Sequence, residues 1–292
     1  YWLANPRNLL EGYPPAIGTE RTQRSLRTRA TFDQAERRLT GTDGLGDPGF
    51  NIDNLRQLHY QSTNYTGELV TDDVVAVCSA VEDWSPYTDD GATVEQACSV
   101  LEAWDRTHLT DSVGAHVFWE FWQRVRGTPD LWAVPFDAAD PVNTPRDLNI
   151  DEPSVVEAVR QSLADGVARL VEAGIPMDRP WGEVQFDEKN GERYGIHGGP
   201  GAMMFSVIAS DLVDGEGYSD IVAGNSYIQA VTWDESDCPD AYAILTYSQS
   251  TDPASDHYAD STELYSNGGW IDMPFCEADR DAQEIRRETV EE

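Results

Sequence analysis

Residues 153–173, PSVVEAVRQSLADGVARLVEA, have apolar side chains that recur every three or four positions. This spacing puts them on one face of a helix, and the two acidic residues before Pro153 suit its positively polarised start. Gly174 and Pro176 end the segment. After about Pro180, the apolar residues instead alternate or run continuously, as they do in strands. The change of spacing predicts an α+β fold with a helical first half and mainly antiparallel strands in the second.

Residues 1–180 are predicted to form the mainly helical portion. Residues 1–18, YWLANPRNLLEGYPPAIG, contain three prolines and two glycines and indicate an extended or looping entry segment. Thr19 or Thr22 can cap a first helix that reaches about Arg38, before the glycine-rich GTDGLGDPG ends it. Further helices are expected at residues 52–60, 70–82, 93–104 and 112–126.

Residues 181–280 are predicted to form the mainly β portion. Four runs carry the strand pattern: FSVIASDL (205–212), NSYIQAVTWD (225–234), AYAILTYSQS (241–250) and WIDMPF (270–275). The two runs that flank ESDCPD (235–240) are expected to form a hairpin. Residues 281–292 are a charged tail, and the chain from Glu277 onward is expected to be helical at first and frayed at its end.

The charge balance excludes a nucleic-acid partner. The chain has 53 Asp and Glu against 20 Lys and Arg, a formal net charge of −33. A phosphate backbone would be repelled by most of such a surface. No apolar run reaches the ~18 residues of a membrane helix, so no membrane span is expected. The chain begins with Tyr1, so we expect no signal segment here and interpret the sequence as part of a longer protein.

The four cysteines are expected to form disulfides. No CxxC pair is present, which argues against a zinc ribbon or a redox dithiol. Cys78 and Cys98 bracket a polar, turn-rich loop, while Cys238 and Cys276 lie near the ends of expected strands. The simplest pairing is therefore Cys78 with Cys98 and Cys238 with Cys276. Four buried free thiols are the alternative.

Motifs for serine hydrolysis or metal binding are not found in the sequence. GNSYI (224–228) lacks the second glycine of a GxSxG nucleophile elbow. The five histidines form no HExxH, and the one pair with helical spacing is His116 with Glu120. Such a pair is more often solvated or capped than metal-bound. We predict no metal site and no cofactor.

Residues 196–208, IHGGPGAMMFSVI, form a turn-rich approach to an apolar strand. Gly198 and Gly199 permit positive φ and close backbone approach, so the turn can position His197 or backbone amides. The interpretation that we favour is structural. The turn leads into a core strand, and His197 bonds a backbone carbonyl.

Four arginines lie within nine residues of GTERTQRSLRTR (18–29), although cations are scarce in this chain. On a helix, Arg21, Arg24 and, less closely aligned, Arg27 share one face. Their mutual repulsion requires compensation by carboxylates, by carbonyl groups or by a developing anion in a site. Two interpretations remain open from the residues alone: an ion-paired surface and a functional site.

With the preceding YWLANPRNLLEGYPPAIG, this stretch resembles the penicillin acylase family of N-terminal nucleophile hydrolases, particularly its acyl-homoserine-lactone and cyclic-lipopeptide acylases. Further blocks occur in the family's order and bring the resemblance to nearly the whole chain. They are AWDRTHLTDSVGAHVFWEFW (103–122), IHGGPGAMMFSVI (196–208), GNSYIQAVTWD (224–234) and YSQSTDPASDHYADSTELYSNGGWIDMPF (247–275).

The resemblance implies an α/β/β/α sandwich for the whole enzyme and a precursor that cleaves itself to expose a serine at the start of a β chain. The serine's own α-amino group acts as the base. A backbone amide and an asparagine bind the oxyanion, and a downstream arginine orients the catalytic groups. That arginine is the last residue of a segment with the pattern GxER, which is residues 18–21 here. Arg21 is therefore the catalytic residue implied here, with Arg24 as the alternative if the register slips.

The remaining features are implied to be structural. Arg27 and Arg29, and Arg24 if it is not catalytic, would tie the helix to carboxylates and carbonyls in the rest of the enzyme, and the HGGPG turn would support the sandwich. Because the chain begins at Tyr1, the serine, its base and the asparagine are expected to lie upstream. The chain alone is therefore expected to be inactive.

The implied partner is the remainder of the acylase, comprising an α chain and the N-terminal half of the β chain. The implied substrates are small N-acyl compounds, such as acyl-homoserine lactones, lipopeptides or penicillins, in a periplasmic or extracellular setting. The alternative is a non-enzymatic extracellular binding module with acidic, aromatic-rich loops such as DWSPYTDD (83–90). Burial of Trp104, Trp119 and Trp122 in helices would favour the acylase.

Overall fold

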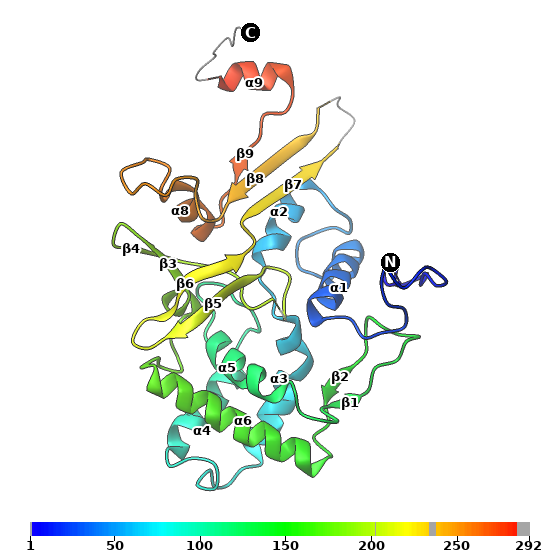
Figure 1. Ribbon diagram of the computed structural model, residues 1–292, viewed down its shortest axis with the longest axis vertical. Coiled ribbons are helices and arrows are strands. Elements are labelled where there is room, and N and C mark those ends of the chain that lie inside the picture. Colours follow the sequence, from blue (N-terminus) through cyan, green and yellow to red (C-terminus); the bar gives the residue numbers. More distant parts are fainter. Residues whose placement is uncertain (1, 202, 234–237, 285–292) are drawn as a thin grey trace.

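The computed structural model describes residues 2–201, 203–233 and 238–284. The first part of the chain is mainly helical (Figure 1). It also contains a short antiparallel pair of strands, β1 (Trp132–Val134) and β2 (Arg146–Leu148). The helices are α1 (Leu26–Thr40), α2 (Ile52–Tyr60), α3 (Tyr65–Ser79), α4 (Gly91–Ala103), α5 (Ala115–Val125) and α6 (Pro153–Glu172). The five helices expected after the first are all present, within a few residues of their predicted bounds.

Helix α1 begins later than the sequence predicted. Its cap is Ser25, whose hydroxyl accepts a hydrogen bond from the Thr28 amide at 3.2 Å. The hydroxyls of Thr19 and Thr22, the expected caps, instead bond each other at 2.9 Å. The prediction that Arg21, Arg24 and Arg27 share a helical face is therefore wrong, because the first two precede the helix.

The second part of the chain contains most of the strands, and the ladders between its described strands are antiparallel. Strand β3 (Phe186–Lys189) pairs with β4 (Glu192–Gly195), and β5 (Ile208–Val213) pairs with β6 (Gly217–Gly224). A three-stranded sheet has the order β7 (Tyr227–Thr232), β8 (Asp240–Leu245) and β9 (Ile271–Asp272). Short helices α7 (Trp181–Val184), α8 (Asp260–Ser266) and α9 (Glu277–Gln283) complete the described elements. The α+β prediction is confirmed.

The predicted hairpin is formed by β7 and β8, with Thr232 opposite Asp240. Residues 234–237 of its connection lie outside the described residues. Helix α9 agrees with the helical start expected for the tail, and the frayed end at 285–292 also lies outside them. Strand β6 was not expected, because it lies between the predicted strand runs at 205–212 and 225–234.

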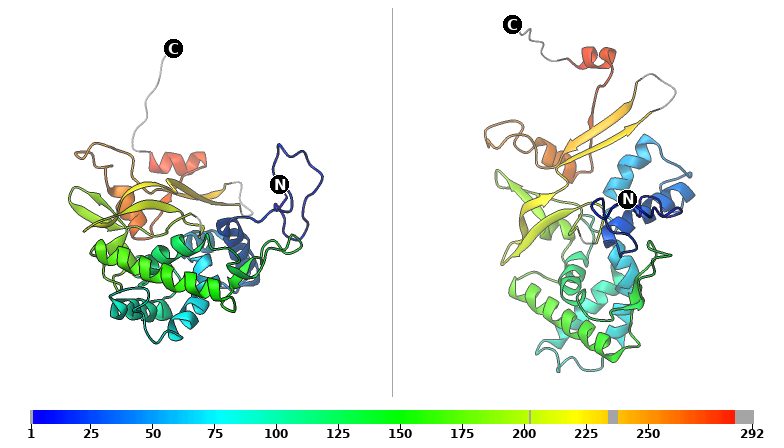
Figure 2. Two further views of the ribbon diagram at one scale, coloured as in Figure 1. Left: turned by 60° about the horizontal axis from the view of Figure 1, so that its bottom comes forward. Right: turned by 45° about the vertical axis from the view of Figure 1, so that its right-hand side comes forward.

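The main core lies among α3–α6, below the layer of strands in the left view of Figure 2. Trp104, Phe118 and Trp122 pack together there, and the rings of Phe118 and Trp122 are stacked 6.3 Å apart. Trp104 and Trp122 are buried and Trp119 is partly buried, the arrangement that favours the acylase scaffold over a binding module. In the described ranges, no helix combines the length and apolarity required to cross a membrane.

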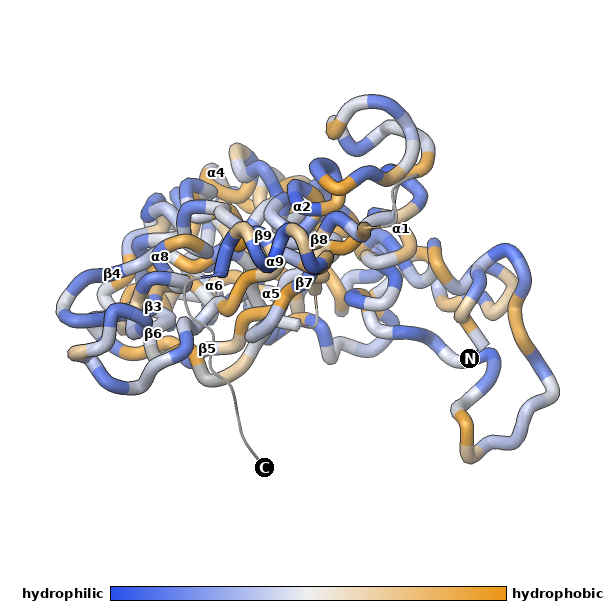
Figure 3. The backbone as a smooth tube through the Cα atoms, turned by 90° about the horizontal axis from the view of Figure 1, so that it is seen from above, coloured by the Kyte–Doolittle hydropathy of each residue, from blue (hydrophilic) through white to orange (hydrophobic). Residues whose placement is uncertain are grey.

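The entry segment before α1 forms a loop that projects from the body (Figures 2 and 3). Trp2 and Leu3 anchor the start of this loop, because both are buried. The Trp2 carbonyl accepts a hydrogen bond from the Leu10 amide at 3.0 Å, which closes the first turn of the loop. The extended or looping entry predicted from its prolines and glycines is confirmed.

Both expected disulfides are present. Cys78 is bonded to Cys98, and Cys238 is bonded to Cys276. The first disulfide links α3 to α4 across the DWSPYTDD loop. The second links the connection between β7 and β8 to the residue that caps α9.

We expect titration of the unfolded, unreduced protein to find no free thiol, and reduction to raise the intact mass by the hydrogens of four thiols. Replacing both Cys78 and Cys98 by alanine is expected to lower the free energy of unfolding by about 3 kcal/mol, because the unfolded loop is no longer constrained. Urea titration of the two proteins measures this difference. Four titratable thiols in the parent protein would contradict the pairing.

Candidate functional site

Arg21 and Arg24 lie in the projecting loop and have different environments. The side chain of Arg21 is 63% exposed, and its Nη1 donates to Glu11 Oε1 at 3.0 Å. Arg21 also has a positive φ of 53°, so its backbone is in the left-handed region. Arg24 donates to the Thr19 carbonyl at 2.8 Å, and its guanidinium carbon lies 5.5 Å from the ring centre of buried Trp2. Arg21 is thus accessible, whereas Arg24 helps to hold the loop together.

Arg29 is a fully buried cation that joins α1 to the loop before β2. Its Nε donates to the Val142 carbonyl and its Nη1 to the Pro145 carbonyl, both at 2.6 Å. Nη2 donates to the Tyr65 hydroxyl at 3.3 Å. Burial lowers the pKa of Arg29. Arg29 was expected to bond groups in the rest of the enzyme, and the structure corrects this, because these partners lie in the same chain. Arg27 is exposed.

The HGGPG turn is packed too tightly for larger residues. His197 Nε2 lies 2.8 Å from the Ser266 carbonyl, the backbone partner that the structural interpretation expected. Gly198 has a φ of 90°, and a Cβ atom there would lie 2.6 Å from the Ser206 carbonyl oxygen. A Cβ atom on Gly199 would lie 2.5 Å from Nδ1 of His108. His197, Gly198 and Gly199 therefore join this turn to α8 and to the buried ring of His108.

We expect Gly199→Ala to lower the free energy of unfolding by about 1–3 kcal/mol, because the new methyl group overlaps the buried His108 ring. Gly127→Ala is the matched control, since a Cβ atom there meets nothing within 4 Å. Urea unfolding of the two variants measures the difference. Equal stabilities would show that the turn can move away from His108 without cost.

His116 and Glu120, the pair with metal-ligand spacing on α5, bond other groups of the protein. His116 Nε2 lies 3.0 Å from the Pro176 carbonyl, and burial lowers the pKa of His116 to about 4. Glu120 pairs with Arg124 at 2.7 Å and accepts a hydrogen bond from the Tyr218 hydroxyl. Among the described residues, the group of three that could hold a metal ion is Cys238, Cys276 and Asp279. Its two sulfur atoms form a disulfide and are not available as thiolate ligands.

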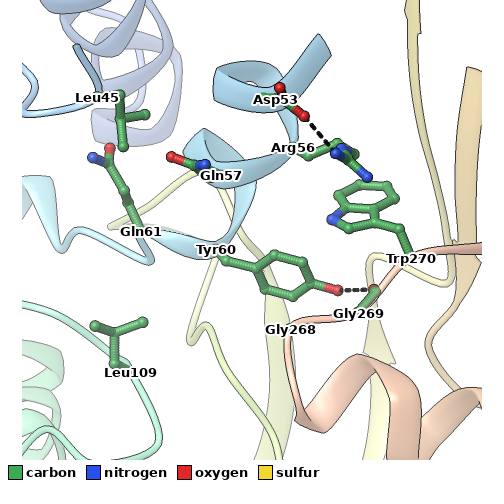
Figure 4. Close-up of a pocket in the computed structure, with 10 residues that line it drawn as sticks. All are labelled: Leu45, Asp53, Arg56, Gln57, Tyr60, Gln61, Leu109, Gly268, Gly269 and Trp270. Carbon is green, nitrogen blue, oxygen red and sulfur yellow. Dashed lines mark hydrogen bonds and ion pairs between the residues drawn. The ribbon is translucent and has the colours of Figure 1, made fainter. Parts of the chain in front are cut away.

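A pocket of about 600 Å³ lies between α2 and the turn that follows α8 (Figure 4). Tyr60 and Trp270 form aromatic walls, and the Tyr60 hydroxyl donates to the Gly269 carbonyl at 2.9 Å. Arg56 Nη2 forms an ion pair with Asp53 Oδ1 at 2.6 Å, and the guanidinium carbon of Arg56 lies 3.9 Å from the ring centre of Tyr242. This pocket was not predictable from the sequence, because the residues of its walls are far apart in the chain and no local motif connects them.

The residues that line this pocket include no catalytic pair. Among the lining residues, no nucleophilic side chain lies beside a base. Burial raises the pKa of Tyr60, so its hydroxyl stays protonated at neutral pH. The positive charge of Arg56 is balanced by the carboxylate of Asp53. The features described here are therefore a pocket with aromatic walls and an accessible arginine in the projecting loop. Acyl transfer requires a nucleophile, which neither feature provides.

The sequence profile of the penicillin amidase family matches residues 1–282, so this chain belongs to the penicillin amidase family. It is 40% identical over 282 residues to aculeacin-A acylase of Actinoplanes utahensis, an alignment that covers 95% of this chain and 34% of that protein. The family resemblance proposed from the sequence blocks is confirmed.

Two further relatives are described as acyl-homoserine lactone acylase PvdQ. The protein of Pseudomonas syringae pv. syringae is 31% identical over 277 residues, covering 94% of this chain and 34% of that protein. The protein of Pseudomonas putida is 31% identical over 291 residues, covering 99% of this chain and 35% of that protein. The chain therefore spans about a third of the length of these relatives.

Proposed function

We propose that this chain is the C-terminal portion of the β chain of an amidohydrolase that removes acyl groups from N-acyl compounds. The observation that carries the proposal is the family match over residues 1–282, together with acylase relatives that align along almost the whole chain. The names of these relatives support acyl-homoserine lactones and aculeacin A as substrates, and the sequence resemblance implies lipopeptides as a further class. Penicillins, the substrates in the family's name, are another class to test.

In the proposed mechanism, a serine outside these residues attacks the amide carbonyl while its own α-amino group removes the hydroxyl proton. The amide C–N bond then breaks, and the amine leaves with the proton that the α-amino group passes to it. Water hydrolyses the resulting acyl-enzyme, which releases the carboxylic acid and restores the serine. Arg21 would orient the α-amino group and its neighbours through its planar donor fork. Its exposure supports this role, because the contact with Glu11 is a surface ion pair that costs little to exchange.

The remainder of the acylase is the proposed partner, and the outer strands offer a surface for it. Tyr227 is 53% exposed and Trp233 is 76% exposed, at the two ends of β7, and Phe275 beyond β9 is 66% exposed. In the described sheet, β7 is an edge strand. Exposed aromatic side chains beside a strand edge are typical of surfaces that another segment covers. Export to the periplasm or the extracellular space is proposed as well, and the two disulfides support it.

The test compares the complete acylase with residues 1–292 alone, using acyl-homoserine lactones, a lipopeptide and a penicillin as substrates. We expect the complete enzyme to release the free amine from at least one class and the isolated chain to release none. Failure of the complete enzyme on every N-acyl compound would contradict the proposal. Turnover by the isolated chain would contradict the placement of the nucleophile.

A further inference from the structure

A second, smaller cavity of about 250 Å³ lies between α1, α2 and β7. Its walls are mainly apolar, and they include Leu55, Phe205, Ile228 and Trp270. We call it the His59 cavity, because His59 of α2 also lines it. The side chains of Gln34 and Gln229 border it as well. An engineered cavity of about 150 Å³ with apolar walls binds benzene, so this volume can accept a substituted single ring.

His59 has a buried polar atom that lacks a hydrogen-bond partner. The residue is 6% exposed, and its Nε2 has no hydrogen-bond partner among the described residues. Buried polar atoms are normally paired, and each one left unpaired costs stability. Burial lowers the pKa of His59 to about 4, so the ring is neutral at pH 7.

The tautomer of this neutral ring follows from Ser206. The Ser206 hydroxyl donates its hydrogen to the His59 carbonyl oxygen at 3.0 Å. The same Oγ lies 3.5 Å from Nδ1 of the ring, where it can only accept. The tautomer with its hydrogen on Nδ1 is the one that lets this oxygen accept, and in that tautomer Nε2 is an acceptor.

We propose that the His59 cavity is a binding site for a small neutral phenol or alcohol. The apolar body of the ligand fills the space beside Phe205 and Trp270, and its hydroxyl donates a hydrogen bond to Nε2 of His59. A carboxylate is a poorer match, because it brings a charge into apolar walls and has no hydrogen to donate. The inference does not depend on the deacylation reaction, since it rests on the cavity and on the unpaired nitrogen.

Phenol and fluorobenzene test this proposal in the complete acylase by calorimetric titration. The two probes have similar size, and only phenol has a hydroxyl donor. His59→Leu keeps the approximate volume of the side chain but removes the acceptor. We expect this variant to bind phenol about fivefold more weakly and fluorobenzene unchanged, which corresponds to the loss of one hydrogen bond. Equal losses for both probes would overturn the role of His59.

A second variant keeps the test decisive if His59→Leu does not fold. Ala35→Leu extends a side chain from α1 into the cavity and is expected to abolish phenol binding, whereas Ala168→Leu on the exposed surface of α6 should bind as the parent does. Circular dichroism checks that both variants are folded. The proposal is wrong if the complete enzyme shows no saturable phenol binding, as when another segment fills the cavity, or if Ala35→Leu binds normally.

Discussion

Arg21→Ala is expected to lower kcat of the complete acylase about 100- to 1000-fold, the loss typical of removing one donor that stabilises a transition state. The melting temperature should hardly change, because the side chain is 63% exposed and its described ion pair, with Glu11, is at the surface. Arg21→Lys should recover only part of the activity, since an ammonium lacks the planar fork of a guanidinium. Turnover and thermal melting of the purified variants measure both effects.

Two other arginines serve as controls for this prediction. Arg29→Ala should reduce the melting temperature with a smaller effect on turnover, because it leaves the Val142 and Pro145 carbonyls without their donor. Arg24→Ala should also reduce the melting temperature, since Arg24 lies over the ring of buried Trp2. If Arg24→Ala abolishes turnover while Arg21→Ala does not, Arg24 is the orienting residue. If neither variant affects turnover, the loop is an ion-paired surface.

The free energy of unfolding is expected to fall steeply as the pH drops below 6.5. Burial lowers the pKa of His59 and His116 to about 4 and that of His108 to about 3, and it also lowers the pKa of His197. The unfolded chain therefore binds more protons than the folded protein in this range. A histidine with a folded pKa of about 3 or 4 contributes about 1.4 kcal/mol per pH unit, so His59, His108 and His116 together contribute roughly 4 kcal/mol per unit between about pH 6 and 5. His197 adds to the slope in the same direction.

The direction of this effect follows from the depressed pKa values. The stabilisation is fully present above pH 6.5 and is lost as the pH falls toward the folded values. Burial raises the pKa of Asp33 and Asp73, whose contributions have the opposite sign at the acidic end of the range. Urea unfolding at a series of pH values measures the slope.

Single-histidine variants identify the source of the slope. His116→Gln should lower the slope by about 1.4 kcal/mol per pH unit, which corresponds to one proton and to roughly a third of the contribution from His59, His108 and His116. His257→Gln should leave the steep fall in place, because His257 is exposed and its hydrogen bond to Asp260 raises its pKa. A stability that is flat from pH 7 to 5 would show that the buried histidines are hydrated in solution.

The sequence predicted the helices well where a long apolar repeat met a clear end signal. Helix α2 has the predicted bounds, and α6 ends one residue before its predicted limit. Helix α3 begins five residues before the predicted start, because the side chain of Asn64 caps it by accepting from the Gly67 amide at 2.8 Å. The start of α1 was misplaced because threonine and serine are similar caps, and only the fold selects Ser25.

Strand β6 had a signal that was overlooked. The dipeptide Asp214-Gly215 lies between two apolar runs, a pattern typical of hairpin turns, and Gly215 has a φ of 78°. The cysteine pairing was predictable, because Cys78 and Cys98 bracket one loop and Cys238 and Cys276 lie near the ends of expected strands. The two pockets were not predictable, since each combines α2 with segments about two hundred residues away in the chain, such as Trp270.

The central claim is that this chain belongs to an acylase whose nucleophile is a serine outside these residues. Treating the complete enzyme with phenylmethylsulfonyl fluoride, in which a reactive serine displaces fluoride, tests this claim directly. Peptide mass spectrometry should find one sulfonyl adduct, on the serine that begins the β chain, in step with the loss of activity. An adduct on a serine within residues 1–292, formed in step with that loss, would contradict the account.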